Sequence, residues 1–123
     1  MHELSIANRL VEIALEVAEN EGAEAIEGVT VRIGALSCVH NRALAFSFDL
    51  VTKDTPLEGA ELRIIDVPVK VFCVACDREV ELPGIQRFRC PLCDTPSGDI
   101  RQGRELEIES IEIRDADKAT AGP

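Results

Sequence analysis

The apolar residues near the start of the chain recur with the spacing of one face of a helix. Between residues 4 and 20 they are separated by three and four positions: Ile6, Leu10, Ile13, Ala14, Val17 and Ala18. The opposite face carries the glutamates Glu12, Glu16 and Glu19. Gly22 follows as a typical helix stop signal. We therefore expect a first helix over residues 4–20 with an acidic side facing solvent.

Strand and helix patterns then follow one another along the chain. Residues 29–35 alternate valine and isoleucine with Thr30 and Arg32, which predicts a half-buried strand. Asn41 is a candidate N-cap for a second helix, in which Leu44, Phe48 and Val51 recur at helical spacing. Residues 60–69 and 105–114 alternate again, and a β-bulge would explain the one slip in the last pattern, at Ser110. Two further strands are expected there.

This order of elements predicts an α+β fold with a small three-stranded sheet and two helices on one face. Residues 1–69 and 101–114 would form the α/β domain. Residues 70–100 contain four of the five cysteines and read as a module inserted before the last strand. Residues 115–123 lack large apolar side chains, so we expect a flexible tail.

Length and charge limit the classes of function. The chain has 123 residues, enough for one domain carrying a small module, and its aliphatic residues must fill the core because only 3% are aromatic. The formal charge of -10 opposes binding to nucleic-acid phosphates. No stretch approaches the ~20 apolar residues of a membrane span, and the start of the chain lacks the pattern of a signal peptide. We expect a cytoplasmic protein that binds neither nucleic acid nor membranes.

Four cysteines form two C-x-x-C pairs separated by 13 residues: Cys73, Cys76, Cys90 and Cys93. Two such turns facing each other supply four thiolates at the corners of a tetrahedron, as in structural Zn²⁺ sites. Pro91 presets a turn within the second pair. Four thiolates leave no open position for a substrate, which favours a structural over a catalytic zinc. Redox dithiols or two disulfides are the alternatives, although the reducing cytosol disfavours disulfides.

The charge of the cysteine module bears on two rival functions. Residues 70–93 carry four basic and three acidic side chains, so with four thiolates and Zn²⁺ the module is close to neutral, while the rest of the chain has a charge of -11. A zinc-ribbon regulator that binds nucleic acid would be expected to carry a basic patch there. A dithiol oxidoreductase is the third hypothesis.

The first three residues form a second candidate ligand set. The Met1 amine, the His2 amide and the His2 imidazole can close fused chelate rings around one ion, and this nitrogen-rich coordination suits Ni²⁺ or Cu²⁺. Glu3 could add its amide or its carboxylate. By itself, a histidine at position two is usually only an exposed residue at a frayed end. Cys38 is more often a small buried residue, and His40 more often a turn or helix-start residue, than a metal ligand.

The sequence resembles the HypA/HybF family of hydrogenase maturation nickel metallochaperones. The resemblance rests on the initial Met-His-Glu-Leu-Ser, the strand Val-Arg-Ile-Gly-Ala-Leu-Ser at residues 31–37, the two C-x-x-C pairs and the closing Gly-Arg-Glu-Leu at residues 103–106. These features cover residues 1 to about 114 in the family's order. The C-x-x-C pairs alone fit many zinc proteins, whereas their combination with the N-terminal motif is specific.

The resemblance implies a non-enzymatic carrier that delivers Ni²⁺ as cargo during assembly of nickel–iron hydrogenase. It implies that His2, Met1 and Glu3 bind nickel and that Cys73, Cys76, Cys90 and Cys93 hold structural Zn²⁺. The implied partners are a HypB-type GTPase, the hydrogenase large subunit and, in some organisms, urease maturation proteins. The chain would act as a monomer or homodimer. Cys38, His40 and the tail have no counterpart in the pattern.

Overall fold

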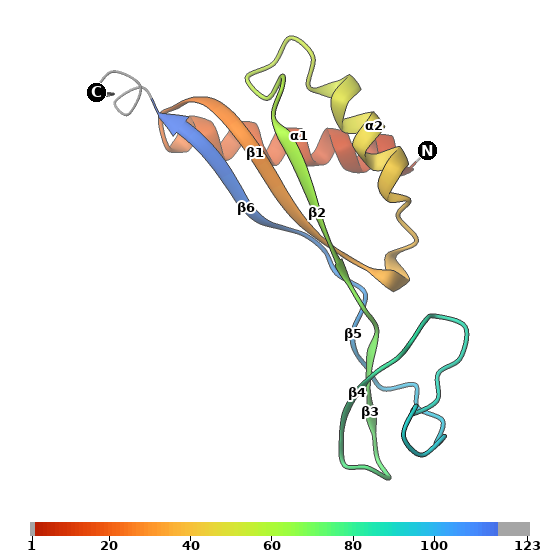
Figure 1. Cartoon of the computed structure of the whole chain (residues 1–123). Helices are drawn as coiled ribbons and strands as arrows, with labels where there is room; N and C mark the ends of the chain where they lie inside the picture. Colours follow the sequence, from red (N-terminus) through yellow and green to blue (C-terminus); the bar gives the residue numbers. More distant parts are fainter. Residues whose placement is uncertain (1, 116–123) are drawn as a thin grey trace. The chain divides into compact units, whose positions relative to one another are not determined.

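A computed structural model describes residues 2–115 of the chain (Figure 1). Its elements are α1 (His2–Asn20), β1 (Ala23–Gly34), the 3₁₀ turn η1 (Ala35–Ser37), α2 (Asn41–Val51), β2 (Glu61–Val67), β3 (Lys70–Cys73), β4 (Arg78–Glu81), β5 (Ile100–Gln102) and β6 (Leu106–Asp115). Met1 and residues 116–123, which include the expected tail beyond Asp115, lie outside the described residues. Within residues 2–115 no helix is long and apolar enough to cross a membrane.

The chain divides into two compact units. Unit 1 comprises residues 1–31, 39–64 and 108–123, and unit 2 comprises residues 32–38 and 65–107. The strands β1, β2 and β6 form one sheet in the order β2-β1-β6. The four cysteines of the two C-x-x-C pairs all belong to unit 2.

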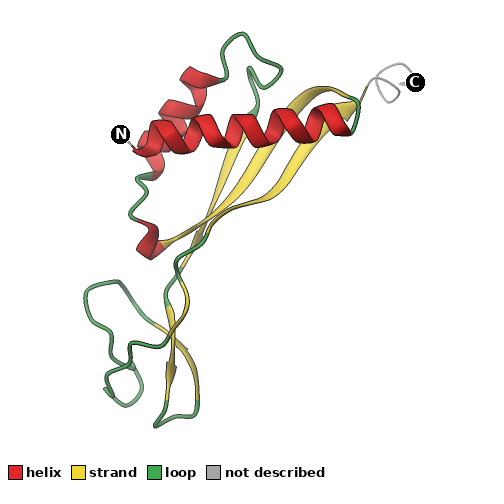
Figure 2. Cartoon of the chain, turned by 180° about the vertical axis from the view of Figure 1, so that it is seen from behind, coloured by secondary structure: helices red, strands yellow, loops and turns green. Residues whose placement is uncertain are grey.

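Unit 1 contains both α-helices, which pack against each other. Figure 2 shows α1 lying across one face of the sheet. Of the apolar stripe predicted for α1, Leu10, Ala14 and Ala18 are buried, whereas Ile6, Ile13 and Val17 are only half-buried. The buried face is shifted to include Ala7 and Val11, and strand, loop and α2 residues complete the core: Ile26, Val29, Val31, Leu44, Phe48 and Leu57. The predicted α+β fold, a three-stranded sheet with two helices, is confirmed.

Three element boundaries differ from the sequence prediction. α1 begins at His2 rather than Leu4, so the N-terminal ligand candidates lie in its first turn. β1 begins at Ala23, six residues before the predicted start. The N-cap of α2 is His40 and not Asn41: His40 has extended backbone, and its Nδ1 accepts a hydrogen bond from the Ala43 N–H at 3.3 Å. Asn41 is instead the first helical residue.

Gly28 explains why the sequence pattern did not predict residues 23–28 as part of β1. Glycine is disfavoured inside a strand unless another group must approach closely. In unit 1, Arg63 of β2 and Glu112 of β6 form an ion pair across the middle strand, and a Cβ at Gly28 would collide with the Glu112 carboxylate. Tertiary pairing, rather than local propensity, therefore extends β1 through this position.

Unit 2 has an antiparallel sheet of its own, in the order β4-β3-β5, which the sequence analysis did not predict. Lys70 pairs with Glu81 and Cys73 with Arg78 in the β3–β4 hairpin. Its core consists of Val69, Val71, Cys73, Val80, Leu82 and Cys90, with Leu36, Cys76, Phe88 and Ile100 packed against it. Because Leu36 comes from the segment after β1, the cysteine region shares a core with residues outside the predicted insertion.

Two glycines allow chain segments of unit 2 to approach closely. The Gly34 N–H donates to the Glu105 carbonyl at 2.7 Å, and the Leu36 N–H donates to the Gly103 carbonyl at 2.8 Å. A Cβ at Gly34 would overlap the Gly103 carbonyl, and Gly103 itself has φ 123°, a conformation that favours glycine. These bonds hold residues 34–36 beside residues 103–105.

Candidate metal centre

The four predicted zinc ligands come together in unit 2. Cys73 ends β3, Cys76 lies in the following turn, and Cys90 and Cys93 lie on the long segment between β4 and β5. All four sulfurs are within 4.8 Å of one another, with Sγ–Sγ distances of 3.5 Å (Cys73–Cys93), 3.6 Å (Cys76–Cys93) and 3.9 Å (Cys76–Cys90). A tetrahedron with Zn–S bonds of ~2.3 Å has sulfur–sulfur edges of about 3.8 Å, so the cluster has the size that Zn²⁺ requires.

The two C-x-x-C turns are similar but not identical. In the first, the N–H of the third residue along, Cys76, donates to Cys73 Sγ at 3.4 Å, and in the second the N–H of the second residue along, Leu92, donates to Cys90 Sγ at the same distance. Each turn is followed by an aspartate in the left-handed region: Asp77 (φ 55°) and Asp94 (φ 62°). Aspartate tolerates this conformation better than most residues. Each turn thus places the two sulfurs of its pair on the same side of the loop.

The electrostatics of the cluster favour a bound cation. The Thr95 hydroxyl, 3.1 Å from Cys93 Sγ, is the main cause that lowers the pKa of Cys93 to about 6. The hydrogen bond with Cys93, followed by desolvation and the other two sulfurs, raises the pKa of Cys76 to about 12. Like charges this close cannot all ionise unaided. A divalent cation at the centre would allow four thiolates to coexist.

The five cysteines are free thiols. The shortest of the sulfur–sulfur distances given above, 3.5 Å, is far longer than the ~2.05 Å of a disulfide bond. Cys73 and Cys90 are buried, whereas Cys93 is exposed. The arrangement is that of a ligand cage with one solvent-facing sulfur.

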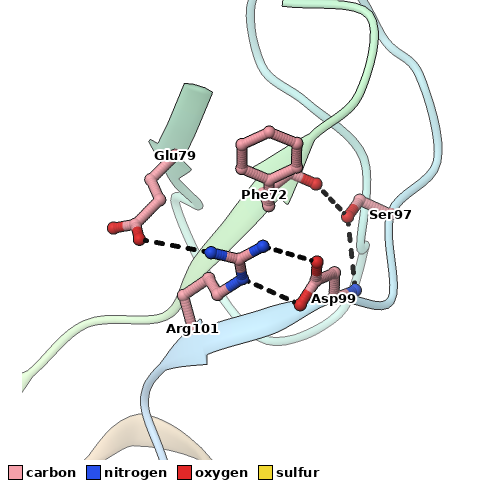
Figure 3. Close-up of polar contacts among 5 residues, drawn as sticks. All are labelled: Phe72, Glu79, Ser97, Asp99 and Arg101. Atoms are coloured by element: carbon pink, nitrogen blue, oxygen red, sulfur yellow. Dashed lines mark hydrogen bonds and ion pairs between the residues drawn. The ribbon is translucent and has the colours of Figure 1, made fainter. Parts of the chain in front are cut away.

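A polar cluster fixes the strand that ends at Cys73 (Figure 3). Arg101 of β5 pairs with both carboxylate oxygens of Asp99 at 2.9 Å, lies 3.8 Å from the Glu79 carboxylate of β4, and places its guanidinium 4.7 Å from the centre of the Phe72 ring. The Ser97 hydroxyl donates to the Phe72 carbonyl at 2.5 Å. Phe72 precedes Cys73, so these contacts position the first ligand from all three strands of the sheet.

Two of the N-terminal ligand candidates, His2 and Glu3, lie in unit 1, in the first turn of α1. Glu3 Oε1 is 3.7 Å from His2 Nδ1, and Glu3 Oε2 accepts a hydrogen bond from the His40 N–H at 3.0 Å. That hydrogen bond is the main cause that lowers the pKa of Glu3. The first N–H groups of a helix have no acceptor in the preceding turn, and in Glu3 the residue's own backbone N–H also helps to lower the pKa of its carboxyl. Met1 is outside the described residues.

The structure shows the surroundings of Cys38 and His40, whose roles the sequence did not assign. Cys38 is exposed and has φ 64°, so its interpretation as a small buried residue is wrong. His40 caps α2, which confirms its interpretation as a residue at a helix start. The contact between the His40 N–H and Glu3 was not predicted, because no sequence signal relates positions 37 residues apart.

The sequence also matches the family model described as HypA, hydrogenase/urease nickel incorporation, metallochaperone, over residues 1–113. The chain belongs to the HypA family. Members of the HypA family are metallochaperones of hydrogenase maturation and not enzymes. The family resemblance stated from the sequence motifs is therefore confirmed.

Relatives within the HypA family match along almost their whole length. The hydrogenase maturation factor HypA of Chloroflexus aurantiacus is 52% identical over 112 residues, which cover 91% of this chain and 98% of the relative. The hydrogenase maturation factor HybF of Salmonella typhimurium is 39% identical over 113 residues, covering 92% and 99%.

Solved HypA structures support the fold. The solution structure of the nickel metallochaperone HypA from Helicobacter pylori aligns with a TM-score of 0.64 at 24% identity, covering 92% of this chain and 97% of that one. A second HypA solution structure aligns with a TM-score of 0.67 at 27% identity, covering 92% and 96%. The HypA fold thus extends over both units of the chain.

Proposed function

We propose that this chain binds Ni²⁺ at its N-terminus and delivers it for maturation of nickel–iron hydrogenase, while Zn²⁺ occupies the four-cysteine cage. The observation that carries the proposal is the family match over residues 1–113, which includes both ligand sets. The two sites are chemically distinct, because one offers four thiolates and the other offers nitrogen and carboxylate groups.

The position of His2 supports its assignment as a nickel ligand. Its side chain is 54% exposed, and its amide lies in the first turn of α1, where backbone N–H groups lack helical acceptors. The Met1 amine, the His2 amide and imidazole, and Glu3 would form the ligand set. An exposed site allows an ion to be passed on to a partner without unfolding the carrier.

The sulfur geometry and the knuckle turns support Zn²⁺ in the cysteine cage. Four thiolates at tetrahedral spacing make a closed site with no position for substrate, so zinc would be structural. The unit that contains the cage has eight acidic and seven basic side chains in sequence, a formal charge of -1. This charge disfavours the alternative of a zinc-ribbon regulator that binds nucleic acid, which a salt-dependent gel shift would support.

The decisive experiment is a nickel titration of untagged protein, with metal analysis before and after. We expect His2→Ala to lose the high-affinity nickel site and keep one zinc per chain. His40→Asn is the matched control, because asparagine keeps an N-cap side chain on α2 while removing the only other imidazole. Nickel binding by His2→Ala equal to that of the unchanged protein would refute the N-terminal site.

The same metal analysis separates the remaining alternative. A dithiol oxidoreductase would contain no zinc and would form a reversible disulfide between Cys73 and Cys76. One zinc per chain, lost on Cys76→Ser, would exclude that function for the cage.

A hydrogenase maturation factor acts together with other maturation proteins. We propose a HypB-type GTPase and the hydrogenase large subunit as the partners, and urease maturation proteins in organisms that contain urease. We place this exchange in the cytoplasm.

A further inference from the structure

The second helix exposes two large apolar side chains. Among the described residues of unit 1, Phe46 and Leu50 are the large hydrophobic residues with substantial exposure, 65% and 48%. They are four positions apart on α2, so they lie on one helical face, one turn from each other. Apolar side chains gathered in this way on a surface often mark a site of protein interaction.

Both side chains line a groove between α2 and the first turn of α1. The groove has a volume of about 330 Å³, and its walls are Glu3, Leu4, Ala43, Phe46, Ser47 and Leu50. This size is at the lower end for binding pockets, and it suits one or two large side chains rather than an extended ligand. At one end the groove is bordered by Glu3, so it reaches the proposed nickel site.

The charge of unit 1 indicates the chemistry of the occupant. Its sequence has fifteen acidic and six basic side chains, a formal charge of -9, which is nearly all of the chain's -10. α2 itself has one basic residue, Arg42, and one acidic residue, Asp49, so the excess negative charge of unit 1 lies on its other segments. A second copy of the chain would bring the same charge of -9 and be repelled, whereas a basic partner would be attracted.

We propose that this groove is the docking site for a maturation partner that inserts a large apolar side chain from a surface rich in lysine and arginine. Phe46 and Leu50 supply the apolar contact, and the charge of unit 1 supplies the attraction and orientation. Docking there would bring the partner's residues beside Glu3, where nickel is handed over. The choice of partner and this last consequence rest on the proposed function, whereas the groove and the charge of unit 1 do not depend on nickel.

The test is calorimetric titration of the metal-loaded full chain with two purified probes, the HypB-type GTPase and the hydrogenase large subunit. One of the two probes should be the occupant of the groove. For that probe, we expect Phe46→Ser and Leu50→Lys each to weaken the affinity by about tenfold or more. Leu106→Ser is the matched control, since Leu106 is 46% exposed but lies in unit 2, and it should leave the affinity within about twofold. Raising the salt concentration should weaken binding of the unchanged chain.

The proposal is overturned if both probes bind both groove variants as tightly as the unchanged chain, or if binding is insensitive to salt. It is also overturned if sedimentation shows a dimer of the unchanged chain that Phe46→Ser dissociates, because the occupant is then a second copy. Nickel titration of Phe46→Ser should match the unchanged chain. If His2→Ala binds nickel normally while Phe46→Ser still loses the partner, the N-terminal site fails and the docking site stands.

Discussion

Glu3 links the start of α1 to the start of α2 through a single carboxylate. Its Oε2 accepts from the His40 N–H at 3.0 Å, while Oε1 faces His2 Nδ1 at 3.7 Å. The Glu3 side chain is only 14% exposed, although Glu3 is the second residue of α1 and lies close to the end of the helix. The same carboxylate therefore fixes the beginning of both helices and faces the candidate nickel ligand.

The ionisation of Glu3 should be visible at the His40 amide. The hydrogen bond from His40 lowers the pKa of Glu3 below its ordinary value of 4.5. Its contribution to stability is thus fully present above pH 4.5 and is lost as the pH falls through the lowered folded-state pKa. We expect the His40 amide proton signal, followed by NMR in metal-free protein, to move upfield with a midpoint below 4.5. Glu3→Gln should abolish this titration, and a midpoint at or above 4.5 would contradict it.

Short elements of unit 2 depend on close backbone contacts more than on side chains. β5 has three residues and β3 and β4 have four each, lengths at which residue patterns carry little information. The end of β1 and the turn after it are bound to the link between β5 and β6, through the bonds from Gly34 to Glu105 and from Leu36 to Gly103. A side chain at Gly34 has nowhere to go, since its Cβ would also lie 2.7 Å from the Arg104 nitrogen.

Gly34→Ala should therefore be strongly destabilising. The added methyl group meets backbone atoms, which cannot rotate away, and relieving the overlap would separate the Leu36 N–H from the Gly103 carbonyl. We expect a loss of about 2 kcal/mol or more in the free energy of unfolding, measured with urea.

Gly84→Ala is the control for this substitution. Gly84 lies in the same unit, and a Cβ there would meet nothing within 4 Å. The free energy of unfolding of the Gly84→Ala variant should differ from that of the unchanged chain by less than about 0.5 kcal/mol. Equal effects of the two substitutions would show that the close approach at Gly34 is unimportant.

At the scale of the whole molecule, charge and metal chemistry are divided between the two units. Unit 1 holds both α-helices and a formal charge of -9, and unit 2 holds the cysteine cage and a charge of -1. The acidity of the chain is therefore a property of the part that carries the N-terminal ligands. The structural metal would act mainly on unit 2, where the cysteine side chains are part of the core.

Removing zinc should affect the two units differently. Without the ion, the four thiols lose their common ligand and the turns at residues 73–76 and 90–93 lose their constraint. We expect a high-affinity zinc chelator to collapse the amide signals of residues 73–99 in an NMR spectrum. Helical circular dichroism at 222 nm should persist, because both α-helices lie in unit 1. Loss of the helical signal at the same chelator concentration would show that the two units fold as one.

Patterns among neighbouring residues were enough to predict several of the helices and strands and the cysteine cluster. The 3.6-residue periodicity of α1, the alternation in β6 and the spacing of the two C-x-x-C turns depend on neighbouring residues, so they could be recognised without a fold. The N-terminal ligand set rests on equally local residues, and it stays a prediction. The cysteine cluster and the three-stranded sheet with two helices were both predicted on this basis.

Features that join distant positions of the chain could be found only in the folded structure. The early start of β1, the sheet of β3, β4 and β5, the close approach at Gly34 and the bond from His40 to Glu3 each depend on a partner far along the chain. Such contacts are set by how the chain closes on itself, and no periodicity records them. The groove beside Phe46 has the same origin, because its second wall is the start of α1.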